Sequence, residues 1–126
     1  MNTLAQTLAG LMALVLIVMW VLEAFFYRAR ALYPIFLIEP DEVKAVRMWA
    51  INVGYYNLCY GVGILTGLWL VNFGNVDAGR VLVIFCLASH VLLGLVLVVT
   101  TPKLWLSSVG ESGLALAGLI ALFVGG

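Results

Sequence analysis

The feature that most constrains this chain is a series of four apolar stretches, each near the length that a helix needs to cross a bilayer. They run from about Leu4 to Tyr27, Val46 to Val71, Gly79 to Thr100 and Leu104 to Val124. A helix rises about 1.5 Å per residue, so about 20 apolar residues span the hydrocarbon core. Because lipid cannot pair backbone groups and the runs lack the alternation of barrel strands, helices are favoured. The stretches predict an all-α integral membrane bundle of four transmembrane helices.

The composition leaves little material for a soluble part. Of the 126 residues, 65% are hydrophobic and 10% are charged, whereas soluble domains average about 45–50% and about 25%. Six basic side chains balance six acidic ones, and they form no basic patch of the kind that binds nucleic acid. We therefore expect one domain over residues 1–126 whose partner is the lipid bilayer, with no nucleic acid bound.

Motifs of soluble enzymes are missing from the sequence. There is no zinc-protease helix, nucleophile elbow or phosphate-binding glycine loop. Cys59 and Cys86 lie in apolar runs without CxxC spacing, which favours a packing role for both. We expect no metal and no cofactor, so any chemistry would have to take place inside the bundle.

Local signals indicate where the helices begin. Asn2 or Thr3 is suited to cap the first stretch. The sequence Glu39-Pro40-Asp41-Glu42 is typical of a helix start, because proline fits the first turn and acids favour the positive end of the helix dipole. That helix would continue into the second stretch. Serines and glycines weaken the start of the fourth stretch, so its helix begins either near Leu104 or near Glu111.

The basic residues predict an orientation. Those in or beside the first and third loops are Arg28, Arg30, Lys44, Arg47 and Lys103, whereas Arg80 alone flanks the second loop. Cytoplasmic loops carry the excess of lysine and arginine. The first and third loops are therefore expected in the cytoplasm, with both termini on the outer (periplasmic) side. Within the first loop, the apolar segment Ala31–Ile38 is expected to lie at the membrane interface.

Polar side chains inside the stretches are candidate functional residues, because they are costly in lipid. The substrate- or proton-binding candidates are Glu23, Asn52, Tyr55, Tyr56, Asn57 and His90. Glu23 lies five residues before Arg28, and Asn52 lies five residues after Arg47. Both would then lie about 7–8 Å inside the same boundary. We expect Glu23 to accept a hydrogen bond from Asn52, or from Tyr56 one turn later, in a polar cluster to which all four helices contribute.

The second stretch carries polar residues on two faces. Asn52, Tyr56 and Tyr60 follow one another at i, i+4 and i+8, whereas Asn57 points about 140° away from Asn52 at 100° per residue. Such a helix suits a position among partner helices. In the third stretch, His90 could relay protons or bond a neighbouring helix, since one imidazole alone cannot form a metal site.

Each of these residues also has a structural explanation. Buried amides hold helices together at about 0.6–2 kcal/mol per contact, and Glu23 is close enough to its helix end to pair with a basic residue. Tyr55 and Tyr60 could belong to an aromatic belt at the interface. Glu111 would favour the dipole at a helix start. The Gly63-x-x-x-Gly67 spacing permits close helix approach.

The stretch Asn52-Val53-Gly54-Tyr55-Tyr56-Asn57 resembles the Asn-x-Gly-x-Tyr-Asn pattern of a small bacterial membrane family, domain-of-unknown-function family thirteen-oh-four. Glu23-Ala24-Phe25-Phe26 is similar to that family's glutamate and aromatics near the end of the first helix. The resemblance implies four spanning helices in the bacterial cytoplasmic (inner) membrane, and it supplies no activity. Gly110-Glu111-Ser112 departs from the glutamine and proline expected before the fourth helix.

Three functional hypotheses follow. The first is a small transporter or permease-like bundle with a polar cluster around Glu23 and Asn52, in which a glutamate alternates between proton and substrate. The second is an accessory subunit of a larger membrane protein complex. The third is a membrane-embedded enzyme that acts on a lipid or isoprenoid, with Glu23 as general acid or base. A homodimer would enlarge the narrow internal site of so small a bundle.

Overall fold

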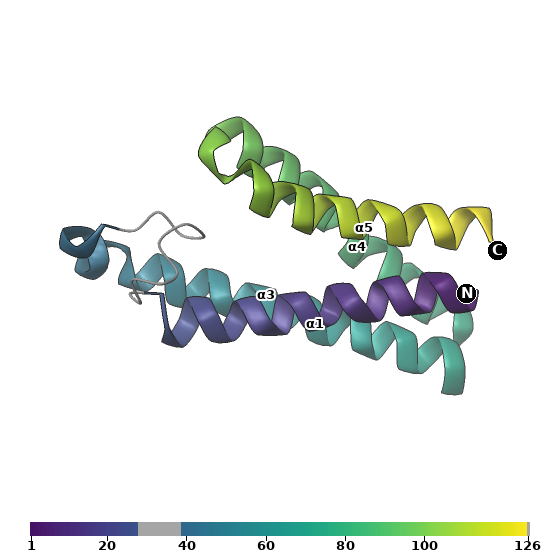
Figure 1. Cartoon of the computed structure of the whole chain (residues 1–126). Helices are drawn as coiled ribbons and strands as arrows, with labels where there is room; N and C mark the ends of the chain where they lie inside the picture. The colour runs from purple at the N-terminus through teal and green to yellow at the C-terminus, as the bar shows by residue number, and fades with distance from the viewer. Residues whose placement is uncertain (28–38, 126) are drawn as a thin grey trace.

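The computed structural model describes residues 1–27 and 39–125. In chain order its elements are α1 (Thr3–Phe25), the 3-10 turn η2 (Pro40–Glu42), α3 (Val43–Phe73), α4 (Val76–Thr100), the 3-10 turn η3 (Pro102–Leu104) and α5 (Trp105–Val124) (Figure 1). This confirms the all-α fold of four long helices. The predicted interfacial segment Ala31–Ile38 lies outside the described residues.

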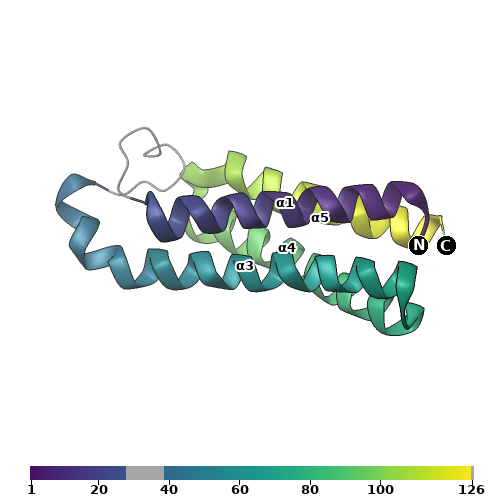
Figure 2. The same ribbon diagram turned by 90° about the horizontal axis from the view of Figure 1, so that it is seen from below.

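The helices pack as two pairs. α1 lies along α3 and α4 lies along α5, while α3–α4 and α1–α5 contacts join the pairs. In Figure 1 the two pairs lie together at the end that holds the chain termini, and they diverge toward the opposite end. The Asn2 side-chain amide donates to the Ala121 carbonyl at 2.8 Å, so both termini lie at the same end of the bundle (Figure 2).

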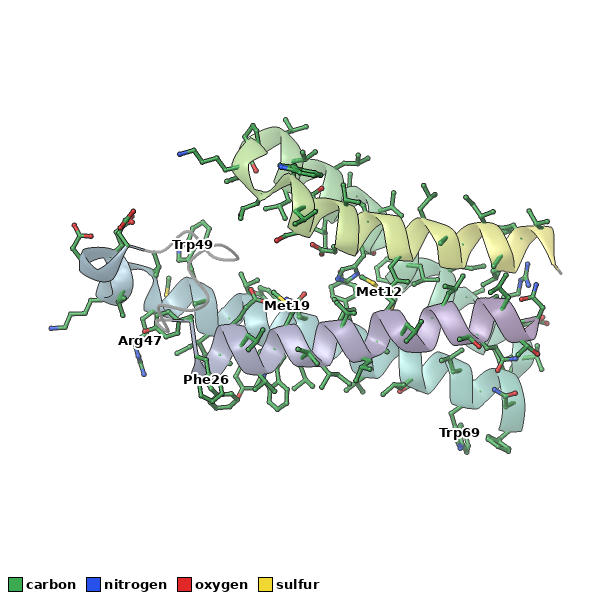
Figure 3. The ribbon with its side chains drawn as sticks, viewed as in Figure 1. Met12, Met19, Phe26, Arg47, Trp49 and Trp69 are labelled. Carbon is green, nitrogen blue, oxygen red and sulfur yellow. The ribbon has the colours of Figure 1, made fainter. Side chains whose placement is uncertain are left out.

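Three segments of the described chain are long and apolar enough to cross a membrane, judged by length and composition: Thr3–Phe25, Val76–Thr100 and Pro102–Val124. The expected fourth span, α3, is not among them, because asparagines and tyrosines occupy the middle of this 31-residue helix. Large apolar side chains cover the outer surface. Trp69, which points away from the bundle, is 58% exposed, whereas Met12 points inward and is fully buried (Figure 3).

Both sequence-based helix starts near the acids and amides are confirmed. The Asn2 side chain accepts the backbone N–H of Ala5 at 2.7 Å and caps α1. Glu39 and Glu42 form a reciprocal capping box at η2, which runs directly into α3. These bonds pair backbone donors that a helix start leaves unsatisfied.

The fourth long helix resolves the choice between its two possible starts. α5 begins at Trp105, directly after η3, so the start near Leu104 is correct. Glu111 therefore lies inside α5, and the prediction that it would cap a helix start is wrong. The serines that weakened the sequence signal serve packing, since Ser108 and Ser112 donate to α4 carbonyls at Gly94 and Val91.

Glycines set the closest helix contacts. A Cβ on Gly61 of α3 would lie 3.2 Å from the Ala13 carbonyl oxygen of α1, and one on Gly67 would lie 2.9 Å from the Gly79 carbonyl oxygen of α4. A Cβ on Gly63 would lie 3.1 Å from the Cys86 sulfur. The close approach predicted from Gly63-x-x-x-Gly67 is thus confirmed, with α4 as the partner. Short side chains allow such contacts between apolar helices.

Candidate ligand-binding pocket between the helix pairs

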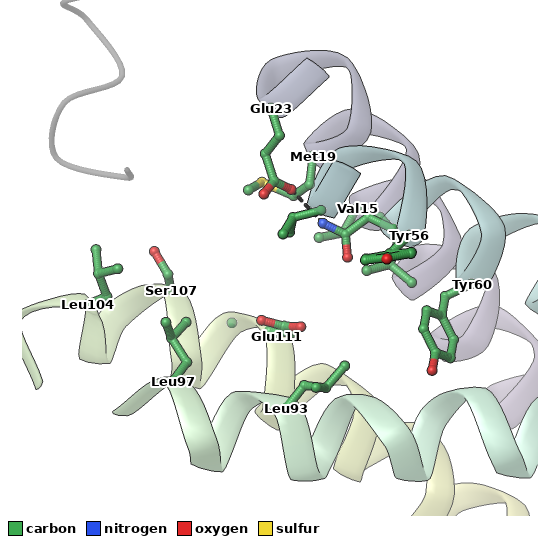
Figure 4. Close-up of a pocket in the computed structure, with 14 residues that line it drawn as sticks. Val15, Met19, Glu23, Tyr56, Tyr60, Leu93, Leu97, Leu104, Ser107 and Glu111 are labelled. Carbon is green, nitrogen blue, oxygen red and sulfur yellow. Dashed lines mark hydrogen bonds between the residues drawn. The ribbon is translucent and has the colours of Figure 1, made fainter. Parts of the chain in front are cut away.

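A partly open pocket of about 830 Å³ separates the two helix pairs where they diverge (Figure 4). All four long helices and η3 contribute to its walls. The lining residues are Val15, Leu16, Met19, Glu23, Val53, Tyr56, Asn57, Tyr60, Leu93, Leu97, Leu104, Ser107, Gly110 and Glu111. Most of the wall is therefore aliphatic, and the polar atoms come from a few side chains. Small-molecule sites in proteins have this size and this balance of apolar and polar lining.

The first polar wall is built by α1 and α3. The Asn57 side-chain amide donates a hydrogen bond to Glu23 Oε1, and both residues line the pocket. Figure 4 shows the Glu23 side chain in this wall. One turn before Asn57, a Cβ on Gly54 would lie 3.1 Å from the Ala24 nitrogen and 3.2 Å from the Glu23 Cβ. The glycine thus lets α1 approach, and the amide at i+3 then faces the carboxyl group.

This pairing corrects the prediction that Asn52 or Tyr56 would be the donor to Glu23. Asn52 is exposed and donates to the Met48 carbonyl of its own helix at 2.7 Å. The prediction assumed that the first and second stretches leave the membrane at matching residues. Instead α3 begins at Val43 and extends past the end of α1. Asn52, two residues before Gly54, is therefore level with the end of α1.

The remaining tyrosines are divided between the pocket and the outside. Tyr56 and Tyr60 line the pocket. Tyr55 does not; it is exposed, and its ring packs edge-on against Trp20 with centroids 5.8 Å apart. Of the six sequence candidates, the structure gathers Glu23, Tyr56 and Asn57 in the pocket wall and leaves Asn52 and Tyr55 outside it.

The opposite wall carries a second carboxyl group. Glu111 reaches the pocket from α5 and faces the wall that holds Glu23 (Figure 4). Its Oε1 lies 3.7 Å from the Nε2 atom of His90, which is completely buried. The other ring nitrogen of His90 contacts the Cys86 carbonyl oxygen at 3.0 Å, and the Tyr60 ring packs edge-on at 4.7 Å between centroids. His90 thus lies behind the wall and touches it through Glu111 and Tyr60.

Sequence reasoning discounted Glu111 because it placed the residue at a helix start. With α5 beginning at Trp105, the spacing of Ser107 and Glu111 at i and i+4 puts both on one helix face. That face lines the pocket. The spacing was visible in the sequence, but its meaning depended on the start of the helix, which serines and glycines obscured.

The arrangement restricts the chemistry that the pocket can support. A carboxylate facing hydrocarbon loses hydration, so it needs a proton, a hydrogen-bond donor or a cation close by. Among the described residues, the lining includes two glutamates and no lysine or arginine. Within residues 1–27 and 39–125, no group of three or more His, Cys, Asp or Glu side chains is placed to hold a metal ion. The pocket can therefore accept an apolar molecule that carries positive charge or hydrogen-bond donors.

A family profile described as "Protein of unknown function (DUF1304)" matches residues 10–123. The matched region contains Glu23 and the whole segment from Asn52 to Asn57, and it confirms the resemblance drawn from those residues. No curated protein and no solved structure matches the chain. The two motifs of the resemblance meet in space, since the last residue of one donates to the first residue of the other. Nearly the whole chain is matched, and it therefore belongs to the DUF1304 family of proteins of unknown function.

Proposed function

We propose that all four long helices cross the cytoplasmic membrane of a bacterium, α3 included. α3 connects to α4 by a short turn and packs along α1. Both α1 and α4 are long and apolar enough to span a membrane. At about 1.5 Å per residue, the 31 residues of α3 give a helix about 46 Å long. This length exceeds the thickness of a hydrocarbon core, which is about 30 Å. Several of its polar side chains are turned inward: Asn57 bonds Glu23, and Tyr56 and Tyr60 face the pocket.

The proposed orientation places the termini on the periplasmic side. Lys44 and Arg47 lie near the start of α3, and Lys103 lies in η3 between α4 and α5. These residues belong to the end of the bundle opposite to the termini, where Figure 3 shows Arg47. At the end of the bundle that holds the termini, Arg80 is the one lysine or arginine among the described residues. The excess of basic residues favours the cytoplasm for the pocket end.

The function that the pocket supports best is transport of lipophilic organic cations in exchange for protons. The observation that carries this proposal is the pair Glu23 and Glu111 on opposite walls of a largely apolar pocket. A hydrophobic body would fill the aliphatic space, and its positive charge would replace one proton held at the carboxyl groups. The faces of Tyr56 and Tyr60 would add cation–π attraction.

The position of the pocket also suits a transporter. It lies between two helix pairs, and the close Gly67–Gly79 contact joins α3 to α4 near the opposite end. Rocking of one pair against the other about that contact would open and close the pocket, as in transporters whose halves move around a central site. An accessory subunit does not require a pocket with two carboxyl groups.

Binding of tetraphenylphosphonium to the purified protein tests the proposal. We expect saturable binding that weakens in Glu23→Gln and in Glu111→Gln and is retained in Asn52→Gln, an exposed amide outside the pocket. Tetraphenylborate, which has the same shape and the opposite charge, should not compete. Proteoliposomes should accumulate the phosphonium when a proton gradient is imposed, and both glutamine variants should lose this uptake.

Two outcomes would overturn the transport proposal. One is equal binding of the phosphonium and the borate ions, which would show that the pocket does not select charge. The other is phosphonium binding without proton-driven uptake in vesicles that hold folded protein. Binding of neutral lipids or isoprenoids in place of both ions would instead favour the membrane-embedded enzyme.

A further inference from the structure

The buried histidine has its hydrogen-bonding pattern fixed by the backbone. His90 Nδ1 lies 3.0 Å from the Cys86 carbonyl oxygen, one turn earlier in α4. A carbonyl oxygen can only accept, so Nδ1 carries the hydrogen. In the neutral ring Nε2 is then an acceptor with a lone pair, and only the imidazolium form has a hydrogen on both nitrogens.

The Nε2 atom faces a group that is also an acceptor when ionised. It is buried without a hydrogen-bond partner among the described residues, and Glu111 Oε1 lies 3.7 Å away. A neutral Nε2 and a carboxylate oxygen would present lone pairs to each other in an apolar wall. A single proton removes this conflict, whether it resides on Glu111 or on His90. If Glu111 and His90 Nε2 each held a proton, a neutral carboxyl group would lie beside a buried imidazolium ion that lacks a counter-charge.

We propose that His90 and Glu111 together hold one proton at the α4–α5 wall, and that a bound lipophilic cation displaces this proton. The inference rests on the proposed transport function for its ligand, while the shared proton itself rests on geometry alone. On binding, the O–H or N–H bond that holds the shared proton breaks, and its electron pair stays on the atom that held the proton. The proton leaves to water in the pocket and the cation takes its place, which leaves a carboxylate at Glu111 and a neutral ring at His90. One charge enters and one leaves.

Among the described titratable groups near Glu111, His90 is the one placed to share its proton. Glu23 on α1 faces across the pocket and is bonded by Asn57. On α3, Tyr56 and Tyr60 line the pocket, and on α4 the Cys86 thiol packs near Gly63. Within residues 1–27 and 39–125, the pocket lining has no lysine or arginine that could balance a Glu111 carboxylate. His90 is therefore the one basic group in contact with Glu111 among the described residues.

The chain contains a single histidine, so ring-¹⁵N-histidine labelling reports on His90 alone. We would record ¹⁵N spectra of the whole protein in bilayers, for wild type, Glu111→Gln and the pocket control Ser107→Ala. Nδ1 should carry its hydrogen in all three. The Nε2 resonance should show the shared proton in wild type and in Ser107→Ala. It should shift in Glu111→Gln, because the amide can donate to Nε2 but cannot release a proton.

Addition of tetraphenylphosphonium should move the wild-type Nε2 resonance to that of a bare acceptor, with release of one proton per pair into a weakly buffered solution. The proposal is overturned if Nδ1 lacks the hydrogen, or if the ligand-free Nε2 resonance is the same in wild type and Glu111→Gln. Should Glu111→Gln fail to fold, Glu111→Asp, which withdraws the carboxyl group by one methylene, must shift Nε2 instead. Failure of phosphonium to bind would refute the transport function and leave the ligand-free comparison decisive for the shared proton.

Discussion

The side-chain amide of Asn57 in α3 donates a hydrogen bond to the Glu23 carboxyl group of α1, and this bond joins the two helices at the wall of the pocket. It also gives a role to two residues of the segment 52–57, the glycine at position 54 and the asparagine at its end. Gly54 brings the helix backbones together, and Asn57 then meets the carboxyl group. The two asparagines of this segment have different surroundings, because Asn52 is exposed and bonded within its own helix.

Replacement of these two asparagines should have unequal effects on stability. Asn57→Leu removes the donor to Glu23, and we expect it to lower the free energy of unfolding by about 0.6–2 kcal/mol, the range for polar contacts between apolar helices. Asn52→Leu loses only a bond to Met48 and should change stability by less than about 0.5 kcal/mol. Reversible unfolding in mixed detergent micelles, followed by circular dichroism, measures both. Equal losses would show that the Asn57–Glu23 bond does not stabilise the bundle.

The α3–α4 contact should tolerate no added methyl group. A Cβ on Gly79 would lie 2.5 Å from the Gly67 carbonyl oxygen and 2.8 Å from the Val71 nitrogen. Because backbone atoms cannot move aside without separating the helices, Gly79→Ala should cost about 1–3 kcal/mol. Gly113 of α5 provides the matched control, since the nearest atom to its Cβ position is 3.9 Å away. There alanine should be neutral or stabilise by up to about 1 kcal/mol. The same unfolding assay distinguishes them, and a neutral Gly79→Ala would contradict the packing.

A second glycine contact can be tested by compensation. A Cβ on Gly94 of α4 would overlap the Ser112 side chain of α5. Gly94→Ala should therefore destabilise the protein, and adding Ser112→Gly should restore part of the loss, because it removes both overlapping side-chain atoms. A double-mutant cycle of unfolding free energies should give a coupling of about 0.5–3 kcal/mol. A coupling near zero would mean that α4 and α5 do not meet at this pair.

Much of the fold could be predicted from hydrophobicity and helix-start chemistry. Local signals, each contained in a short part of the sequence, predicted the four apolar stretches, the Asn2 cap and the helix start at Glu39–Glu42. The site depended on register between helices. One misjudged boundary moved the partner of Glu23 from Asn57 to Asn52, since the end of α1 and the overhang of α3 are set by tertiary packing.

The second wall of the pocket was harder to predict for a different reason. Glu111 is flanked by Gly110 and Ser112, a composition typical of a helix start. Tertiary contacts override this tendency: Ser112 donates to the Val91 carbonyl at 2.8 Å, and Gly94 leaves room for the Ser112 side chain. The residues that weaken the helix locally are the ones that fasten α5 to α4. Such compensation cannot be deduced from one helix considered alone.

The proposed orientation can be tested with a matched pair of cysteine variants. Asp41 in η2 and Asp77 at the start of α4 are both exposed acids at opposite ends of the bundle, and acids contribute little to orientation. A membrane-impermeant maleimide should label Asp77→Cys in intact cells and Asp41→Cys only after permeabilisation. The wild-type protein measures the background from Cys59 and Cys86. The reverse pattern would place the termini in the cytoplasm, and labelling of both in intact cells would refute a spanning bundle.

The two pocket carboxyl groups should also differ from surface acids in their chemistry. Dicyclohexylcarbodiimide is an apolar reagent that adds to the O–H of a carboxyl group shielded from water, and the product stays attached as an N-acylurea. Glu23 and Glu111 border aliphatic space, whereas Asp41 and Glu42 are exposed. We expect peptide mass spectrometry to find the adduct on the two pocket glutamates and not on the two exposed acids.

Tetraphenylphosphonium should slow both modifications, because a cation that occupies the pocket pairs with the carboxylates and excludes the reagent. Glu23→Gln should abolish its own adduct and leave that of Glu111, which controls for folding. Modification of the exposed acids at the same rate would mean that the pocket is filled with water, and it would remove the physical basis for exchange of a proton and a lipophilic cation at these residues.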